Sequence, residues 1–268
     1  MRLFGTDGIR GEVGKYPLTA ENVLKLAKAA SIVLRKKNSI SRVVINKDTR
    51  LSNYIFEPAL TSGFISIGIN VVLVGPLPTP ALTILSKSLR ADFSVMITAS
   101  HNPYQDNGLK FFSGSGYKIT AEEEKKIEDC FFNYDFDNFR IKPSNYGKAV
   151  RLKDAIGRYS EALKQNIFNN LDYTKLKVIL DCANGAAYKV APEVLFEIGV
   201  ELDTLGDKPN GVNINDKYGS LFPQRASNLV KKRKSDIGIC LDGDGDRLII
   251  IDEKGEPILG EELLFILA

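Results

Sequence analysis

Short apolar runs rich in β-branched residues alternate along this chain with longer segments of helical periodicity. In the first half, the strand-like runs are residues 42–48, 70–75, 92–98 and 109–113. Helical segments at 19–37 and 54–67 precede the first two runs, and Thr120 with an acidic first turn opens another helix. Strands and helices that alternate in this way build sheets whose two faces are both covered by helices. The pattern therefore predicts an α/β fold.

Residues 133–150 lose the periodicity and gather Asn, Asp, Pro and Gly. The same alternation then returns, beginning with a helix that we expect to end near Phe168. We place a boundary at residues 133–150 and predict two consecutive three-layer α/β domains with mixed sheets, residues 1–150 and 151–252. Residues 253–268 end in LLFILA, a helical pattern that would leave an apolar face uncovered. We expect them to start a third domain that is incomplete in this chain.

Composition excludes several classes of protein. With 44% hydrophobic and 26% charged residues, the chain is neither disordered nor fibrous. The 36 basic and 33 acidic residues leave a net charge of +3, which gives no support to nucleic acid or an anionic membrane as a partner. The composition does not exclude a small anionic substrate.

Cysteine usage and the N-terminus indicate a compartment. Cys130, Cys182 and Cys240 form no CxxC pair, so neither a disulfide framework nor a thiolate zinc site is expected. The N-terminus lacks the apolar segment of a signal peptide, and no apolar run is long enough for a membrane span. We therefore predict a cytoplasmic protein.

The sequence DGDGDR at 242–247 alternates carboxylates with glycines between two apolar runs. In extended backbone, alternate side chains share one side, so we expect Asp242, Asp244 and Asp246 to converge. Such oxygen ligands suit Mg²⁺, which completes its shell with water and phosphate. His101 is the only histidine, which excludes sites built from several histidines. The other interpretation is a Gly/Asp hairpin turn without a metal.

A hydroxyl-rich loop, TASHNP at 98–103, follows one of the strand-like runs. Open α/β sheets bind ligands at the carboxyl ends of their strands, so Ser100 is our candidate nucleophile. His101 stands beside it, and Lys110 is placed to hold an anion. The alternative is a capped turn in which the polar side chains bond the backbone. A hydrolase triad is poorly supported because no GxSxG elbow is present.

A glycine-rich loop, GTDGIRG at 5–11, lies near the N-terminus. Its amides and the Arg10 guanidinium are able to receive a phosphate, although a plain turn is the commoner role of such a loop. It matches neither nucleotide-binding glycine motif, GxxxxGK[ST] or GxGxxG.

Together and in this order, the three loops resemble the α-D-phosphohexomutase superfamily. The resemblance rests on FGTDGIRG, ASHNPYQDNGLKFF, GPLPTPA at 75–81 and DCANGAA at 181–187, and covers essentially the whole chain. The sequence looks most like the bacterial members that interconvert glucosamine 6-phosphate and glucosamine 1-phosphate, in the supply of cell-wall precursors.

The resemblance implies a role for each site residue. Ser100 would carry a phosphoryl group and pass it to the sugar phosphate, with a bisphosphate intermediate that returns a phosphoryl to the serine. The Mg²⁺ ligands would be Ser100, Asp242, Asp244 and Asp246. The residues that bind the phosphosugar would be Thr6, Asp7, Arg10, Lys110 and Arg247. Arg10, Lys110 and His101 are the candidates for moving the hydroxyl proton.

The sequence also departs from the superfamily pattern. The stretch NDKYGSLFPQ at 215–224 has Leu221 and Gln224 where a polar residue and an acid are usual, so we interpret this loop as structural. The superfamily has four domains, and the sugar-reading and remote phosphate loops of the last two are not in this sequence. We expect the N-terminal portion of a mutase, working as a homodimer or with a missing C-terminal half.

Three alternatives stay open. The first is a non-catalytic remnant that binds a phosphosugar or Mg²⁺. The second is a phosphatase with an aspartate nucleophile in a DxD motif. The third, within the mutases, is a phosphoglucomutase or phosphomannomutase, because the sugar-reading loop is absent.

Overall fold

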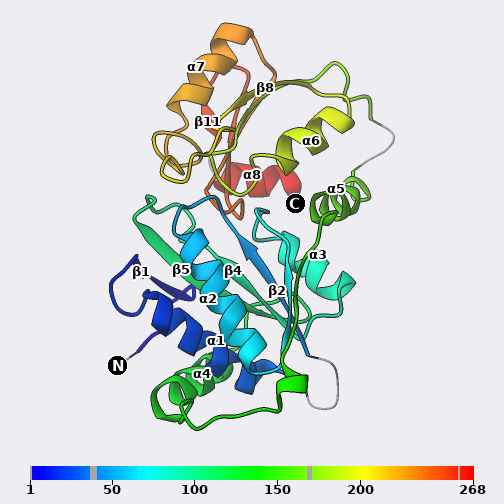
Figure 1. The fold of residues 1–268 in the computed structure, drawn as a ribbon. Coiled ribbons are helices and arrows are strands. Elements are labelled where there is room, and N and C mark those ends of the chain that lie inside the picture. The colour runs from blue at the N-terminus through cyan, green and yellow to red at the C-terminus, as the bar shows by residue number, and fades with distance from the viewer. Residues whose placement is uncertain (1, 37–40, 168–170, 259) are drawn as a thin grey trace.

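The computed structural model describes residues 2–36, 41–167, 171–258 and 260–268. They form two α/β units, each built on a mixed sheet with helices on both faces (Figure 1). The predicted fold class is confirmed. The helix ends predicted at Lys37 and Phe168 lie outside the described residues.

The first sheet has the strand order β1-β5-β4-β2-β3-β6. Its strands are β1 (Ile9–Glu12), β2 (Arg42–Lys47), β3 (Asn70–Leu73), β4 (Phe93–Ile97), β5 (Asp106–Ser113) and β6 (Ala149–Arg151). The pairs β1–β5 and β4–β5 are antiparallel and the other pairs are parallel. The carboxyl ends of β2, β3 and β4 therefore lie at one edge of the sheet.

Alternate residues of β2 enter two different hydrophobic clusters. Val43 and Ile45 belong to one cluster and Val44 to the other. The first cluster lies beneath α1 (Ala20–Leu34), α2 (Asn53–Ser66) and α4 (Ala121–Asn133), and the second beneath α3 (Ala81–Ser88) and α5 (Ala155–Lys164). A strand buried on both faces reads as a nearly continuous apolar run, which explains why Val43, Val44 and Ile45 follow one another in the sequence.

Capping residues begin two of these helices. Thr120 forms a capping box with Glu123 at the start of α4, as the acidic first turn predicts. Thr19 accepts a hydrogen bond from the backbone amide of Asn22 at the start of α1. Both helices therefore begin where the sequence places them.

Two short strands are absent from the sequence prediction. The glycine-rich N-terminal loop continues into β1, whose Arg10 is paired with Gly108 of β5. The segment 133–150, which we predicted as a connection, contains a 3₁₀ turn at Pro143–Asn145 and then β6, paired in parallel with β3.

The second sheet has the strand order β11-β10-β9-β7-β8. Its strands are β7 (Lys177–Asp181), β8 (Glu201–Leu205), β9 (Ile237–Leu241), β10 (Leu248–Ile251) and β11 (Pro257–Ile258). The helix α7 (Gln224–Arg233) packs on the face that carries Ile179, and α6 (Val190–Glu197) lies on the other side (Figure 1). The carboxyl ends of β7 and β9, which run parallel, share one edge.

The two units share part of one hydrophobic cluster. Leu82 of α3, Tyr159 of α5 and Val190 of α6 all belong to it. The helix α5 thus lies between a helix of the first unit and a helix of the second. This packing brings the carboxyl edges of the two sheets together.

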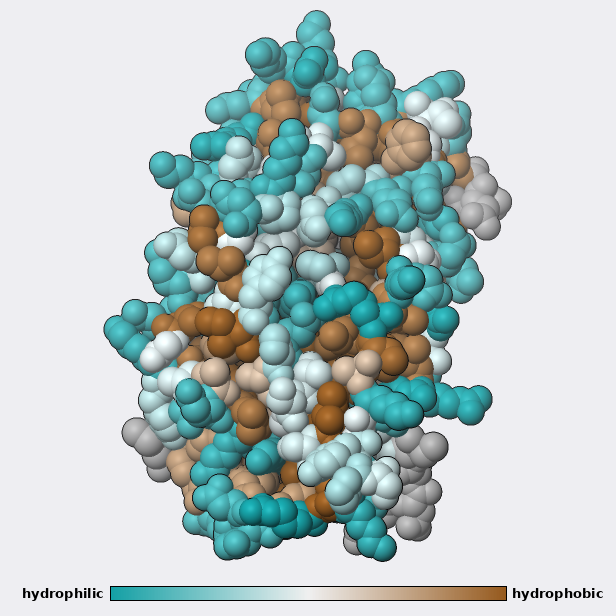
Figure 2. Space-filling view, in the orientation of Figure 1, coloured by the Kyte–Doolittle hydropathy of each residue, from teal (hydrophilic) through white to brown (hydrophobic). Residues whose placement is uncertain are grey.

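Apolar side chains also lie at the surface. Figure 2 shows hydrophobic residues around the middle of one face, at the level where the two units meet. The last helix, α8 (Gly260–Leu267), leaves Leu264, Phe265 and Ile266 exposed among the described residues, as the LLFILA pattern predicts. No helix in the described part of the chain is long and apolar enough to cross a membrane.

Candidate active site

Ser100 lies in the loop between β4 and β5, where the carboxyl edge of the first sheet faces the second unit. Its backbone has the left-handed φ of +52°, and its side chain is fully buried. The Ser100 amide donates to Oγ1 of Thr98 at 2.9 Å, and the Ser100 hydroxyl donates to Oδ2 of Asp242 at 2.6 Å. The turn therefore aims the hydroxyl across the boundary between the two units.

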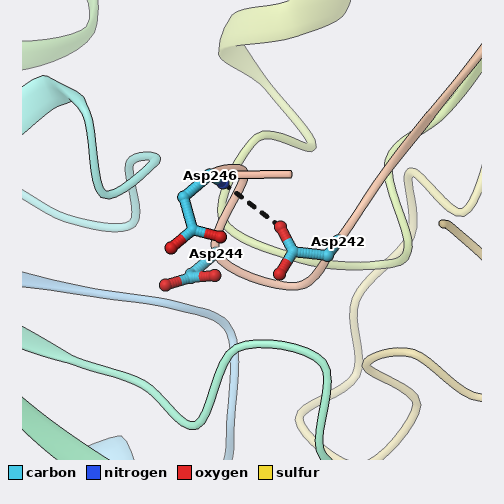
Figure 3. A group of neighbouring side chains, drawn as sticks. All are labelled: Asp242, Asp244 and Asp246. Atoms are coloured by element: carbon cyan, nitrogen blue, oxygen red, sulfur yellow. Dashed lines mark hydrogen bonds between the residues drawn. The ribbon is translucent and has the colours of Figure 1, made fainter. Parts of the chain in front are cut away.

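The three aspartates occupy the tight turn between β9 and β10. One ligand oxygen from each of Asp242, Asp244 and Asp246 lies within 4.8 Å of the others. The convergence agrees with the sequence, but the extended backbone that we expected to cause it is absent. The chain turns instead, with Gly245 at φ +66°, and the Asp246 amide donates to Oδ1 of Asp242 at 3.2 Å (Figure 3).

The Lys110 ammonium separates the protonation behaviour of two of these carboxyls. Burial and the neighbouring charge of Asp244 raise the pKa of Asp242 to about 7. Burial acts in the same sense on Asp244, but the Lys110 ammonium, 2.9 Å from Oδ2, holds the pKa of Asp244 below its usual range. One carboxyl is thus poised to keep a proton while its neighbour stays charged.

The donor set fits a magnesium ion. Oδ1 of Asp244 is buried and has no hydrogen-bond partner among the described residues. A carboxylate oxygen left in that state is costly unless a cation or water meets it. Three carboxylates beside a serine hydroxyl are hard oxygen ligands of the kind that Mg²⁺ prefers.

A cationic group adjoins the aspartate turn. Lys110, on β5, also lies 3.2 Å from Oδ2 of Asp246 and 3.0 Å from Oδ2 of Asp7. Arg10 donates to that same Asp7 oxygen at 2.5 Å, and its Nε is buried without a partner among the described residues. Asp7, Arg10 and Lys110 therefore form one ion-pair network with the turn.

The remaining predicted residues lie at the rim of the site. The Arg247 Nε is 3.7 Å from Asp246, and His101 Nδ1 is 3.5 Å from the Ser100 hydroxyl. Burial and then the charges of Arg247 and Arg10 lower the pKa of His101. Thr6 is exposed, and its carbonyl accepts a hydrogen bond from Lys118 at 2.7 Å. Every predicted site residue except Thr6 thus contacts another member of the group.

Sequence reasoning missed several residues that hold the site together, and Arg50 is the most buried of them. Its Nε donates to Asp48 at 2.8 Å, and its terminal nitrogens donate to four carbonyls of the Ser100 loop, those of Ser100, Asn102, Pro103 and Asp106. All five N–H groups of the guanidinium are used. The available sequence signal is the position of DTR, residues 48–50, where the strand-like run 42–48 ends.

Two further residues cross between the units. Thr79, within the GPLPTPA stretch, donates its hydroxyl to Oδ2 of Asp244 at 2.8 Å. Asn215, in the long loop before α7, donates its amide to the carbonyls of Ser100 and Asn102. Both are small polar residues in loops, where a sequence alone does not say which segment they meet.

Comparison with known proteins identifies the arrangement. The model of phosphoglucomutase/phosphomannomutase α/β/α domain I matches residues 1–138, and the model of domain II matches residues 157–255. The chain belongs to this family. In its terms, Ser100 and Lys110 lie in domain I and the aspartate turn lies in domain II.

Relatives within the family agree along the whole chain. The phosphoglucosamine mutase of Geobacter metallireducens is 49% identical over 267 residues, which cover 100% of this chain and 59% of that protein. The phosphoglucosamine mutase of Zymomonas mobilis is 50% identical over 265 residues, with 99% and 59% covered. The chain thus spans about three fifths of the length of these curated relatives.

A solved structure of the family has the same fold. It is a phosphoglucomutase/phosphomannomutase family protein from Burkholderia thailandensis, with a TM-score of 0.86 and 26% identity. The match covers 99% of this chain and 57% of that one.

Proposed function

We propose that this chain carries the phosphoryl-transfer half of a phosphosugar mutase, with Ser100 as the residue that holds the phosphoryl group. The observation that supports the proposal most directly is the 2.6 Å contact between the Ser100 hydroxyl and Asp242. A hydroxyl oriented by a carboxylate cluster whose members pair with cationic side chains suits the movement of a phosphoryl group, which depends on positioning and charge.

In this proposal, Asp242, Asp244, Asp246 and Ser100 are the residues that would hold Mg²⁺. The ion, when bound, would offset the negative charge of the phosphoryl group as it moves. Lys110 and Arg10 would share that task from the domain I side, and Arg247 from the rim. Thr6 and Asp7 would complete the phosphate-binding loop, Asp7 by orienting the two cations that contact it.

The proton of the reacting hydroxyl needs an acceptor. Of the three candidates Arg10, Lys110 and His101, His101 suits the serine best, because its Nδ1 lies 3.5 Å from the Ser100 oxygen and its lowered pKa keeps the ring neutral near pH 7. Lys110 and Arg10 remain candidates for moving the proton of the sugar hydroxyl. The phosphoserine would phosphorylate the sugar monophosphate, and the resulting bisphosphate would return its other phosphoryl to Ser100.

For the substrate we propose glucosamine 6-phosphate and glucosamine 1-phosphate, because the relatives at 49–50% identity are named phosphoglucosamine mutases. This reaction would supply amino-sugar nucleotide and peptidoglycan precursors. A phosphoglucomutase or phosphomannomutase is the second candidate, because the family model that matches bears those names.

We also propose the organisation and setting of the chain. The domains would span residues 1–150 and 151–252, with 253–268 beginning a third; β6 and β11 each extend a sheet across those bounds. The three free cysteines suit the cytoplasm. The partners would be a small phosphosugar and either a second copy of the chain or the C-terminal half of a mutase.

The test is the fate of the phosphoryl groups of glucosamine 1,6-bisphosphate when it is mixed with this chain and Mg²⁺. The proposal predicts glucosamine monophosphate and a phosphorylated protein in equal amounts. Release of inorganic phosphate would contradict it and favour a phosphatase. Mg²⁺ binding without any transfer would favour the non-catalytic remnant. Glucose 1,6-bisphosphate in place of the glucosamine compound compares the two candidate substrates.

A further inference from the structure

Two residues from different units donate to the same pair of carbonyls in the Ser100 loop. Asn215 of domain II donates through Nδ2 to the carbonyls of Ser100, at 2.9 Å, and Asn102, at 3.0 Å. Arg50 of domain I donates through Nη2 to those carbonyls at 3.0 and 2.8 Å. A carbonyl oxygen has two lone pairs, so each oxygen is satisfied once from each unit.

The position of Asn215 is tightly constrained. Only 7% of its surface is exposed, and its backbone amide donates to the Ala183 carbonyl at 2.9 Å. Its φ of +59° is left-handed, a conformation that asparagine tolerates better than most residues. The side chain therefore has little freedom to leave the two carbonyls.

The aspartate turn packs directly against this contact. A Cβ atom built on Gly243 would lie 2.5 Å from the Ser100 carbonyl oxygen and 2.7 Å from Nδ2 of Asn215. There is no room for a methyl group between the three segments. The turn that carries Asp242 and Asp244, the Ser100 loop and the Asn215 side chain thus meet at one point.

We propose that Asn215 is a positioning residue that locks the Ser100 loop of domain I to the aspartate turn of domain II. The proposal rests on the proposed function, in which Ser100 carries the phosphoryl group beside that turn. Arg50 fixes the loop within domain I, but it has no means of setting the loop against domain II. Asn215 supplies that link, although it lies at the start of the loop that we interpreted from its divergent sequence as structural.

The test compares three variants of the full chain. Asn215→Asp keeps the size of the side chain but replaces the two hydrogen bonds donated by Nδ2 with contacts between oxygens. Asn215→Gly keeps the left-handed backbone, removes the amide and adds no charge. Asn213→Asp is the matched control, because its Nδ2 donates at 3.0 Å to the Lys208 carbonyl, outside the Ser100 loop.

The first measurement is hydrogen exchange at the amides of Ser100 and Asn102. Both are hydrogen-bonded within the loop, to Oγ1 of Thr98 and to the Ala99 carbonyl. We expect about tenfold faster exchange in both Asn215 variants, and a change below about twofold in Asn213→Asp. Equal exchange in Asn215→Gly and the wild type would overturn the proposal.

The second measurement separates positioning from a general loss of structure. In Asn215→Gly, we expect phosphoryl uptake at Ser100 to slow by about tenfold while the Mg²⁺ dissociation constant changes by less than about twofold. Equal losses in uptake and Mg²⁺ affinity would show that the variant disrupts the whole site, and would also overturn the proposal. If the wild type takes up no phosphoryl group, the proposed function fails, and hydrogen exchange alone decides the role of Asn215.

Discussion

The hydroxyl of Ser100 donates to Asp242 across 2.6 Å, although 142 positions separate the two residues in the sequence. The contact joins the edge of one sheet to the edge of the other. Buried polar contacts hold the loops that carry Ser100 and Asp242. A substitution on either side of the boundary between the units should therefore change the position of the Ser100 hydroxyl.

The first prediction concerns pH. The pKa of Asp242 is raised to about 7, so the metal-free carboxyl keeps a proton that Mg²⁺ must displace. Mg²⁺ affinity should therefore fall as the pH drops below 7, with close to one proton released per ion bound near pH 6. Calorimetry in two buffers of different ionisation enthalpy measures that proton. In Asp242→Asn, Mg²⁺ affinity should be lower and its dependence on pH flat; a steep dependence there would contradict the assignment.

The same shift affects stability without the metal. The folded protein holds this proton more tightly than the unfolded chain, whose Asp pKa is near 3.8. The stabilisation is therefore fully present below pH 3.8 and is lost as the pH rises through about 7. Denaturant titration of the wild type and Asp242→Asn across this range should show the loss only in the wild type.

The second prediction concerns Lys110. Its ammonium is almost fully buried and pairs with the fully buried Asp244. Lys110→Met should destabilise the metal-free protein by about 3–5 kcal/mol, because it leaves a buried charge uncompensated. Added Mg²⁺ should restore more stability to this variant than to the wild type.

Lys126→Met is the control for that experiment. Its ion pair with Glu122 has an N–O distance of 2.7 Å and both side chains are exposed, so the cost should stay below about 1 kcal/mol. Similar losses for the two lysine variants would argue against the electrostatic role of Lys110.

The third prediction concerns Arg50. Lysine has three donors where the guanidinium uses five, so Arg50→Lys should leave carbonyls of the Ser100 loop short of partners. We expect a loss of about 2–4 kcal/mol in urea unfolding. In Arg158→Lys, which changes a surface pair with Asp154, the loss should stay below about 0.5 kcal/mol. An Arg50→Lys variant as stable as that control would refute the role of Arg50 in holding the Ser100 loop.

The fourth prediction concerns Gly243. Gly243→Ala forces the Ser100 carbonyl or Asn215 to move, so stability and phosphoryl uptake at Ser100 should both fall. Gly157→Ala, within α5, meets no atom within 4 Å and should stabilise the protein by about 0.5–1 kcal/mol. A harmless Gly243→Ala would mean that the three segments are less tightly packed than described.

Local signals explain how much of the fold could be predicted. The continuous apolar runs of β2 and β4 identify strands buried on both faces, and Thr120 with its acidic first turn identifies a helix start. The strand β6 carries no such signal, because all three of its residues are exposed and its partner β3 lies far back in the sequence.

The site residues likewise divide into those that short motifs predict and those that they do not. The aspartates and Ser100 stand in short motifs whose residue types already suggest their chemistry. Arg50 and Asn215 act on carbonyl oxygens that lie 50 and 115 positions away from them, and no local pattern records which carbonyl an arginine or asparagine will meet. Such residues become visible only when the chain is folded.

The role of Ser100 is tested most directly by locating the phosphoryl group on the protein after exposure to the sugar bisphosphate and Mg²⁺, by mass spectrometry of its peptides. We expect one phosphoryl group, on Ser100, and none in the Ser100→Ala variant. A phosphoryl group on Asp242, or on any residue of the Ser100→Ala variant, would contradict that role.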